Sequence, residues 1–256
     1  MLLAIDLGNT NTVFGVYDGD RLAMHWRLST QKDRTVDEFG ILLRNLFALE
    51  KIDAQKIRKV IIASVVPPLD PVLNEMVESY FSVKPIFITH KNSGIPVLYD
   101  DPREVGADRI VNAVAAVHKY GKPAIVVDFG TATTFDAITP KGEYQGGLIA
   151  PGIVISAEAL YEHAAKLPRI DIQKPSSLIG TSAVASMQSG LFYGYVALVD
   201  GVIVRLKEEL GPKTRVIGTG GQAPLICQET KLIELVDSNL TLDGLQLVAS
   251  RLFRRS

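Results

Sequence analysis

A short segment that occurs twice is the feature that most constrains the fold of this chain. Residues 4–16 read AIDLGNTNTVFGV, and residues 126–138 read VVDFGTATTFDAI. Aligned without gaps at an offset of 122 residues, the copies share an Asp-x-Gly-x-x-x-Thr pattern: Asp6 with Asp128, Gly8 with Gly130, and Thr12 with Thr134. Each copy follows an apolar run near the start of its half of the 256-residue chain. We therefore expect two domains of similar structure, at residues 1–120 and 121–256.

The pattern of apolar residues repeats together with this segment. In the first half, three short apolar runs predict three successive strands, and apolar residues at helical spacing predict a helix at 36–49. In the second half, predicted strands at 125–127, 133–138 and 144–149 again precede helical stretches. Three strands followed by alternating helices and strands, twice over, are typical of an α/β protein built from two layered domains.

The composition limits the kinds of partner that this protein can bind. The 27 Lys and Arg residues nearly balance the 28 Asp and Glu residues, so the chain has little net charge with which to attract nucleic acid or an anionic membrane. Its single cysteine, Cys227, excludes an intramolecular disulfide and a cysteine-based zinc site. No apolar stretch approaches the roughly 20 residues that a membrane span needs. We expect a cytoplasmic protein that binds neither nucleic acid nor membrane.

The repeated segment has the composition of a phosphate-binding turn. Each copy places small and polar residues between two predicted strands, where several backbone N–H groups can face one anion. The carboxylate at each strand end, Asp6 or Asp128, is placed to hold a cation against the same phosphates, and Mg²⁺ binds proteins through one or two carboxylates. The alternative is a pair of hairpin turns without a ligand, and two copies in matching places argue against it.

A third glycine cluster, from Gly218 to Gly221, follows a predicted strand at 215–217. With Ala223 it has the outline G-x-G-x-x-A of a dinucleotide-binding fingerprint, and Asp237 lies about 20 residues further on. That fingerprint needs a continuing series of βαβ units, and only one helix's length of chain follows Asp237. We therefore interpret the cluster as a backbone turn that packs on the adenosine of a nucleotide.

Between the two copies lies a dense polar segment, residues 99–109, which reads YDDPREVGADR. Asp101 and Pro102 predict the start of a helix. Gly106 inside that helix would cost about 1 kcal/mol relative to alanine, which suggests that something approaches the backbone there. Asp108, beside Arg109, could accept a proton from a substrate hydroxyl that attacks a γ-phosphate. An exposed helix face of salt-bridged charges fits the same pattern, and the residues alone leave both interpretations open.

Together these motifs resemble those of the type III pantothenate kinases. The shared patterns are D-L-G-N-T-N-T from Asp6, D-P-x-x-V-G-x-D-R from Asp101, D-F-G-T-A-T-T from Asp128, G-G-x-I-x-P-G from Gly146, M-Q-S-G from Met187 and T-G-G from Thr219. They occur in the family's order over nearly the whole chain. The resemblance implies two duplicated ribonuclease-H-like domains of the actin, Hsp70 and sugar-kinase type, with a nucleotide cleft between them.

The resemblance also implies an activity and a set of site residues. The chain would transfer the γ-phosphoryl group of ATP to the 4′-hydroxyl of pantothenate, which gives 4′-phosphopantothenate and ADP in the first step of coenzyme A synthesis. The ATP-binding residues would be Asp6, Leu7, Gly8, Asn9, Thr10, Asn11, Thr12, Val13 and Thr131. The pantothenate-binding residues would be Tyr99, Gly106, Ala107, Asp108 and Arg109. Asp108 would be the catalytic proton acceptor.

Cofactors and a partner follow from the same resemblance. Asp128 would bind a monovalent cation, K⁺ or NH₄⁺, and Mg²⁺ would accompany ATP, with Asp6 as a candidate Mg²⁺ ligand. Members of the family are typically homodimers, with the substrate pocket completed across the interface.

One position departs from the family's pattern. The family usually has a Gly-Lys-Asn-Thr-like run before Met-Gln-Ser-Gly, and its threonine contacts the substrate. This chain has Gly180-Thr181-Ser182-Ala183, so Ala183 stands where the substrate-binding threonine is expected. A missing hydroxyl contact would cost about 0.5–1.5 kcal/mol of binding free energy. Thr181 or Ser182 could replace it if the loop shifts.

Two other functions share this resemblance at the level of the fold. Regulatory proteins that look like pantothenate kinases act on transcription, but the intact Asp6, Asp108 and Asp128 and the lack of a basic face argue against that function. Another small-molecule kinase or phosphatase of the same fold is the second alternative. The segment 101–109 argues against it, because that segment resembles only the pantothenate kinases, although a fold alone does not decide a substrate.

Overall fold

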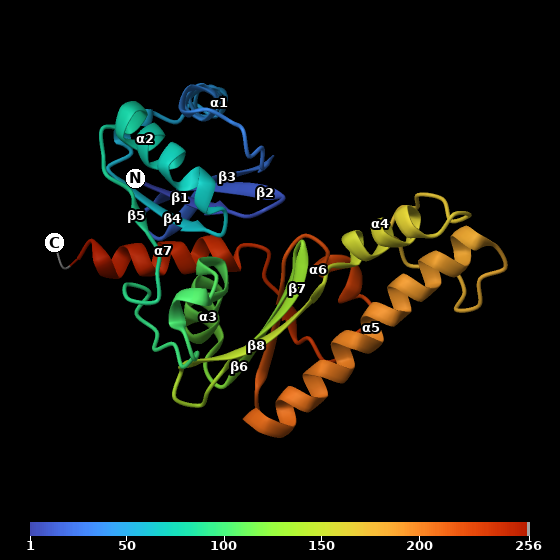
Figure 1. The fold of residues 1–256 in the computed structure, drawn as a ribbon. Coiled ribbons are helices and arrows are strands. Elements are labelled where there is room, and N and C mark those ends of the chain that lie inside the picture. The colour runs from blue at the N-terminus through green and yellow to red at the C-terminus, as the bar shows by residue number, and fades with distance from the viewer. Residues whose placement is uncertain (255–256) are drawn as a thin grey trace. The chain divides into compact units, whose positions relative to one another are not determined.

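The computed structural model describes residues 1–254, and the chain divides into two compact units. The first unit contains Met1–Ile95, Asp100–Ala115 and the chain from Thr241 onward, and the second contains Pro96–Tyr99 and Ala116–Leu240 (Figure 1). The last helix thus belongs to the first unit. The ranges 1–120 and 121–256 remain a prediction about the duplicated halves, because the compact units do not follow a single cut of the chain.

The first unit is built on a five-stranded sheet of order β3-β2-β1-β4-β5. Its strands are β1 (Leu2–Leu7), β2 (Asn11–Asp18), β3 (Arg21–Ser29), β4 (Lys59–Ser64) and β5 (Ile86–Phe87). The first three form an antiparallel meander, and β4 and β5 add in parallel to β1. Its helices are α1 (Val36–Leu49), α2 (Asp70–Phe81), α3 (Ala107–Tyr120), of which the part up to Ala115 belongs to this unit, and α7 (Leu240–Leu252), from Thr241 onward.

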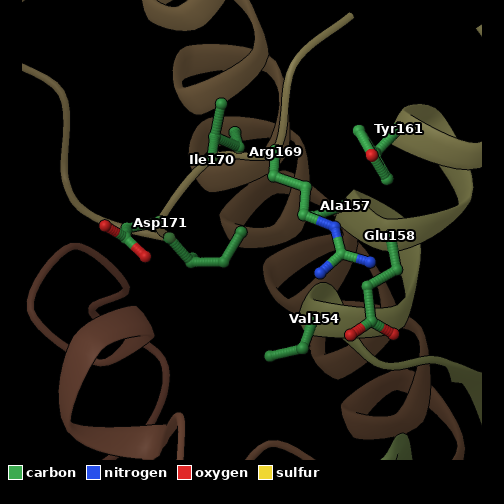
Figure 2. Close-up of a pocket in the computed structure, with 8 residues that line it drawn as sticks. Val154, Ala157, Glu158, Tyr161, Arg169, Ile170 and Asp171 are labelled. Carbon is green, nitrogen blue, oxygen red and sulfur yellow. The ribbon is translucent and has the colours of Figure 1, made fainter.

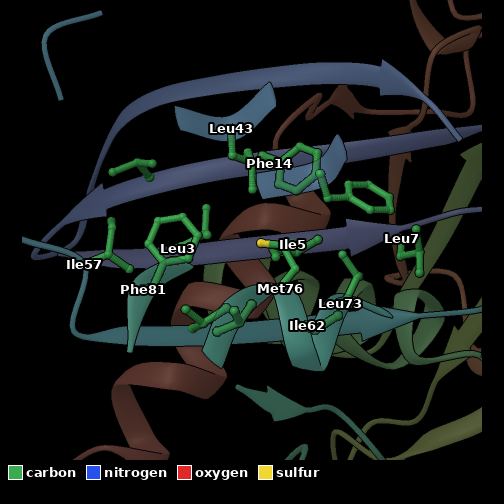
Figure 3. Packing of buried hydrophobic residues seen from close by; sticks show 14 of the residues in the cluster. Leu3, Ile5, Leu7, Phe14, Leu43, Ile57, Ile62, Leu73, Met76 and Phe81 are labelled. Atoms are coloured by element: carbon green, nitrogen blue, oxygen red, sulfur yellow. The ribbon is translucent and has the colours of Figure 1, made fainter. Parts of the chain in front are cut away.

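Successive side chains of a strand point to opposite faces of this sheet, and a separate hydrophobic core lies on each face. Leu3, Ile5 and Leu7 of β1 pack with side chains of α1 and α2, as Figure 3 shows for Leu43, Leu73, Met76 and Phe81. Leu2 and Ala4, on the other face of β1, pack with α3 and α7. Burying each such Leu, Ile or Phe side chain contributes about 1.5–3 kcal/mol. Both faces of the strand are therefore buried, which explains its continuous apolar run.

The start of α1 shows how local sequence sets an element boundary. Thr35 caps the helix, and its side chain accepts the Glu38 N–H, while the Glu38 carboxylate accepts the Thr35 N–H over 2.7 Å. This reciprocal capping box satisfies two N–H groups that a helix otherwise leaves without partners. Three short 3₁₀ helices lie at Ala54–Lys56, Pro67–Leu69 and Pro102–Glu104.

The second unit repeats the same sheet. Its strands are β6 (Ala124–Phe129), β7 (Ala132–Ile138), β8 (Tyr144–Pro151), β9 (Arg215–Thr219) and β10 (Leu235–Val236), in the order β10-β9-β6-β7-β8. Its helices α4 (Ile153–His163), α5 (Ala183–Leu210) and α6 (Ala223–Ile226) pack on one face of the sheet around Phe192, Val199 and Ile203. The order matches that of the first unit strand for strand, which confirms the duplicated fold class predicted from the repeat.

The strand registers correct one detail of the repeat. Leu7 pairs with Thr12 in the first unit, and Phe129 pairs with Thr133 in the second. Thr12 and Thr133 are also both fully buried. Thr133, and not Thr134 as the ungapped alignment predicts, is therefore the structural counterpart of Thr12. The reason is that the first turn contains one residue more than the second, which a comparison without gaps cannot accommodate.

Helix α5 corrects a second expectation. By length and composition it could cross a membrane, with a mean hydropathy of 1.4 over its most apolar window, although no such run was expected from the sequence. Its side chains Phe192, Val199 and Ile203 lie in the core of the second unit. Packing in that core accounts for part of the apolar composition of the helix, because 44% of the apolar window is buried.

Candidate active site

The first repeated segment forms a tight turn between β1 and β2. Asp6 lies one residue before the end of β1, and the Gly8 N–H closes the turn by donating to the Asn11 carbonyl oxygen over 3.0 Å. Asn9 and Thr10 at the tip are exposed, whereas Leu7 and Thr12 on either side are buried. The exposed backbone of a turn anchored in this way is available to an anionic ligand.

The segment that carries Asp108 lies at the same edge of the first sheet. A Cβ atom at Gly106 would lie 3.2 Å from Cγ1 of Val65, so this backbone rests on the residue that follows β4. The Val65 N–H in turn donates to the Leu7 carbonyl oxygen over 3.0 Å. Because β4 runs parallel to β1, this contact brings the start of α3 to the edge where the first turn begins.

The helix boundary in this segment differs from the prediction. Asp101 caps a helix as expected, but that helix is the 3₁₀ turn Pro102–Glu104, and α3 begins only at Ala107. Gly106 lies between the two, and its carbonyl oxygen accepts the Ile110 N–H over 3.2 Å. It is therefore at the N-terminus of α3 and not inside a helix. The expected close approach is present, because Val65 and Asp108 crowd the position.

Asp108 is a partly buried carboxylate at the start of a helix. Burial raises the pKa of its carboxyl group above the usual range, while the Arg109 N–H, which donates to Oδ1 over 2.8 Å, and the Arg109 charge act in the opposite direction. A carboxylate that has lost part of its hydration is a stronger proton acceptor. Arg109 is only 8% exposed, so the alternative of an exposed salt-bridged helix face does not fit.

The second repeated segment forms the corresponding turn between β6 and β7. Asp128 of β6 lies between two threonines in the sheet, Thr134 of β7 and Thr219 of β9. Gly220, which follows β9, packs so closely that a Cβ atom there would collide with Oδ1 of Asp128. The predicted third glycine cluster thus closes over the Asp128 carboxylate. Helix α6 after it has only four residues, so it does not resemble the helix of a dinucleotide-binding unit.

Thr131 and Gly152 define the tip of this second turn. Thr131 is exposed, and its carbonyl oxygen accepts the Gly152 N–H over 3.1 Å. Gly152 follows β8 directly, and a Cβ atom there would lie 2.7 Å from the Gly130 carbonyl oxygen and overlap that of Thr131. Only glycine fits at this position.

Tyr99 and Ala183 belong to the second unit. The segment Pro96–Tyr99 pairs with Tyr144 at the start of β8, through the Leu98 N–H and the Pro96 carbonyl oxygen, both at 2.8 Å. The Tyr99 ring lies against Gly146, where a Cβ atom would be 3.5 Å away. Ala183 is the exposed first residue of α5, and Ser182 caps that helix by accepting the Ala185 N–H over 3.2 Å.

The structure thus distributes the predicted site residues over the two units. Asp6 to Val13 and Gly106 to Arg109 gather at one edge of the first sheet. Tyr99, Asp128, Thr131 and Ala183 lie in the second unit. Within the described residues 1–254, no three His, Cys, Asp or Glu side chains gather as a metal site. Single carboxylates such as Asp6 and Asp128 are the kind of ligand that suits a hydrated Mg²⁺ or a monovalent ion beside phosphate groups.

Sequence reasoning missed Thr30, which lies against the first turn. Its hydroxyl donates to the Gly8 carbonyl oxygen over 2.7 Å, and its N–H donates to the Thr10 carbonyl oxygen over 2.9 Å. The sequence could have indicated Thr30 only through the pairing of the predicted strands. The residue after the third strand of such a meander must lie beside the turn between the first and second strands.

A further pocket in the second unit contains none of the predicted site residues. It has a volume of about 260 Å³ and lies between α4 and residues 169–172. Figure 2 shows its apolar Val154 and Ala157 together with Glu158 and Arg169. The Arg169 guanidinium lies 4.7 Å from the centre of the Tyr161 ring.

Structural comparison bears on the fold alone. A putative Baf family transcriptional activator from Campylobacter jejuni matches with a TM-score of 0.64 at 18% identity, over 98% of this chain and 99% of that one. A putative 2-dehydro-3-deoxygalactonokinase from Sinorhizobium meliloti gives 0.63 at 14% identity, over 99% and 97%. MreB 5 of Spiroplasma citri bound to AMPPNP gives 0.57 at 11% identity, over 99% and 97%. Kinases and actin-like proteins thus share this architecture.

Sequence comparison is more specific. The family model described as type III pantothenate kinase matches residues 2–205. The type III pantothenate kinase of Koribacter versatilis is 53% identical, over 98% of this chain and 96% of the relative. The proteins of the same name from Myxococcus xanthus and Geobacter sulfurreducens are each 55% identical, over 98% of this chain and 98% and 99% of the relatives. The chain therefore belongs to the type III pantothenate kinase family.

Proposed function

We propose that this protein is an ATP-dependent pantothenate kinase. It transfers the γ-phosphoryl group of ATP to the 4′-hydroxyl of pantothenate, which yields 4′-phosphopantothenate and ADP and opens coenzyme A synthesis. The observation that carries this proposal is the identity of 53–55% to type III pantothenate kinases over 98% of the chain. The partly buried Asp108 supports it, because phosphoryl transfer to an alcohol needs a group that accepts the hydroxyl proton.

The proposed chemistry leaves the protein mainly with positioning and charge compensation. The residues Asp6 to Val13 and Thr131 bind ATP, and backbone N–H groups of the first turn face its phosphates. Asp6 is our candidate ligand for Mg²⁺, which would supply positive charge beside the phosphates when bound. As the 4′-hydroxyl oxygen forms its bond to the γ-phosphorus, Asp108 takes the hydroxyl proton, and the bond from phosphorus to the ADP oxygen breaks.

The residues Tyr99, Gly106, Ala107, Asp108 and Arg109 are our proposed contacts to pantothenate. Pantothenate carries a carboxylate, for which a guanidinium such as that of Arg109 is a suitable partner. Ala183 supplies no hydroxyl at the position where the family's threonine contacts the substrate. Because Ser182 already accepts the Ala185 N–H as a helix cap, Thr181 is the better candidate to replace that contact.

We further propose a K⁺ or NH₄⁺ site at Asp128. The neighbouring residues in the sheet, Thr134 and Thr219, offer oxygen atoms, and the Gly220 backbone lies against the carboxylate. Oxygen donors with a single negative charge suit a hard cation of low charge. If K⁺ occupies this site during turnover, replacing it by Na⁺ should lower turnover, and Asp128→Asn should remove the difference between the two ions.

A homodimer is the proposed assembly, formed through the second unit. Many exposed apolar side chains lie in the part of the chain that runs from β8 through α5: Leu148, Ile149, Val154, Ile155, Leu160, Tyr161, Leu178, Ile179, Val184 and Val204. One exposed face of α5 carries the small residues Ser186, Gly190, Gly194 and Ala197, which permit close helix packing, and a groove of about 570 Å³ runs beside them. An apolar surface of this extent is typical of an interface.

The dimer can be tested by analytical ultracentrifugation. Gly194→Arg places a large charged side chain on the α5 face, where the wild-type position has open space, and should yield monomers. Leu49→Arg in the first unit is the matched control, because Leu49 is also exposed and apolar, and it should leave the dimer intact. A monomeric wild-type protein, or a dimeric Gly194→Arg variant, would contradict this interface.

The proposed activity is tested by identifying the product. Purified protein, ATP, Mg²⁺ and pantothenate are incubated in potassium buffer, and mass spectrometry should detect pantothenate that has gained one phosphoryl group. A cytoplasmic location and the lack of a nucleic-acid partner form part of this proposal. Duplex DNA bound at physiological salt, with no phosphorylated pantothenate, would instead favour the regulatory alternative.

A further inference from the structure

The hydroxyl group of Thr30 connects both sides of the first turn. Its oxygen donates to the Gly8 carbonyl over 2.7 Å and lies 2.8 Å from the Thr12 hydroxyl oxygen. The Thr30 N–H donates to the Thr10 carbonyl oxygen over 2.9 Å. These three contacts fasten the turn at its beginning, its tip and its end from a residue outside the repeated segment.

These contacts determine which way the peptide groups of the turn face. In a planar trans peptide, the C=O and the following N–H point in opposite directions. Because the carbonyls of Gly8 and Thr10 point to Thr30, the N–H groups of Asn9 and Asn11 point away from it. Thr30 thus lies on the carbonyl side of the turn, and the N–H side remains for an anion.

We propose that Thr30 is a positioning residue for the nucleotide phosphates: its hydroxyl fixes the peptide orientation in which the first turn presents its N–H groups to ATP. This inference rests on the proposed function, and it adds a residue that neither the motif nor the family resemblance assigns. Thr30 itself does not touch ATP. It acts through the Gly8 carbonyl and the Thr12 hydroxyl.

The hydroxyl, and not the bulk of the side chain, performs this role. Thr30 is only partly buried, and it is not among the residues of the hydrophobic core of this unit. Thr30→Val keeps the shape of the side chain and removes the donor, which leaves the Gly8–Asn9 peptide freer to rotate. Thr30→Ser keeps the hydroxyl. Thr30→Ala is a second variant without the hydroxyl, in case the valine is poorly accommodated.

Thr214 provides a matched control in the second unit. Its hydroxyl donates to the Gly211 carbonyl oxygen over 2.6 Å, so Thr214→Val also removes a hydroxyl that braces a turn. Thr214 lies in the turn between α5 and β9, outside the repeated segments. Thr214 is almost fully buried, so Thr214→Val should lose at least as much thermal stability as Thr30→Val. Only a change at Thr30 should affect the nucleotide.

The experiment is a direct titration of each variant with ATP, ADP and adenosine, together with steady-state kinetics. Thr30→Val should weaken ATP and ADP binding by roughly three- to tenfold, which is the loss expected for one hydrogen bond. Adenosine binding, and the KM for pantothenate, should stay unchanged. Thr30→Ser should bind like wild type, and Thr214→Val should bind ATP normally.

Two results would overturn the inference. One is unchanged ATP and ADP affinity in Thr30→Val and Thr30→Ala. The other is an equal loss for adenosine, because a general loosening of the unit would then explain the effect. Failure of the proposed function can be distinguished from both results. If the wild-type protein binds ATP but does not phosphorylate pantothenate, the titrations still show whether Thr30 affects ATP binding. A wild-type protein that binds no ATP refutes both.

Discussion

In the first unit a backbone N–H and a threonine hydroxyl support the turn between β1 and β2, whereas in the second unit the corresponding residue supports the turn between β6 and β7 through its backbone N–H. The residues concerned occupy corresponding places, because Thr30 follows Ser29, the partner of Asn11, and Gly152 follows Pro151, the partner of Ala132. Both donate their N–H to the carbonyl oxygen at the tip of the turn, at Thr10 or Thr131. Only Thr30 adds a hydroxyl.

This difference shows which properties a duplicated fold keeps and which it varies. Strand order, register and the N–H contact to the tip are the same in both units. The side chain at the supporting position is not, since the carbonyl groups of Gly130 and Thr131 occupy the space where a Cβ atom would lie at residue 152. A substitution that removes one hydroxyl can therefore change the support of the first turn, while the second turn accepts no side chain at the corresponding position.

The largest expected effect concerns Asp108, which only the first unit provides. Asp108→Asn keeps the shape of the side chain and removes the proton acceptor, so kcat should fall by about 10²–10⁴ while ATP still binds. Steady-state kinetics and ATP titration measure the two quantities. Glu104→Gln, an exposed carboxylate in the same segment, is the control and should retain full turnover. Near-normal kcat in Asp108→Asn would show that another group takes the proton.

Gly152→Ala should produce the next largest effect, because it challenges the backbone support of the second turn. The added methyl group overlaps the Thr131 carbonyl oxygen, so the turn must move, at a cost of about 1–3 kcal/mol of unfolding free energy. Thermal denaturation and ATP titration should both show a loss. Gly201→Ala in α5, where a Cβ atom has 3.4 Å to Arg205, is the control and should not reduce stability. Equal behaviour of the two variants would contradict the tight fit.

The raised pKa of Asp108 predicts a pH-dependent stability difference. A carboxyl group whose pKa is higher in the folded state than in the unfolded state binds more protons when folded. Folding stability is therefore lost as the pH rises from the pKa of the unfolded state, about 3.9, through the pKa of the folded state. Asp108→Asn carries no such charge. Its stability relative to wild type should therefore increase from pH 4 upward and then level off, as chemical denaturation at several pH values can show. A difference that stays constant would mean that burial does not affect this carboxyl.

The smallest expected effect lies at the start of α5. Ala183→Thr restores the hydroxyl that the family's pattern contains, and the KM for pantothenate should fall by up to about tenfold. Thr181→Val tests the alternative that Thr181 already supplies this contact, in which case the KM should rise. Unchanged KM values in both variants would remove residues 181–183 from the substrate site.

The sequence predicted the parts of the molecule that depend on local pattern. The three leading strands of each half and the turns that carry Asp6 and Asp128 follow from short-range periodicity and composition. Family membership, and with it the fold class, followed from motifs spread along the chain.

The features that the sequence did not predict depend on contacts between residues far apart in the chain. Thr12 corresponds to Thr133 because of strand pairing, and the Gly106 backbone, just before α3, lies against Val65. The return of α7 to the first unit and the support that Thr30 gives to the first turn are likewise tertiary contacts. Each involves residues more than twenty positions apart or a choice of register, which periodicity alone does not specify.

The most direct test of the central claim is the release of ADP from ATP and Mg²⁺ in potassium buffer, measured with and without pantothenate for the wild type and Asp108→Asn. We predict turnover by the wild type that requires pantothenate, and almost none by the variant although it still binds ATP. ADP release that does not depend on pantothenate, or that survives in Asp108→Asn, would contradict the account.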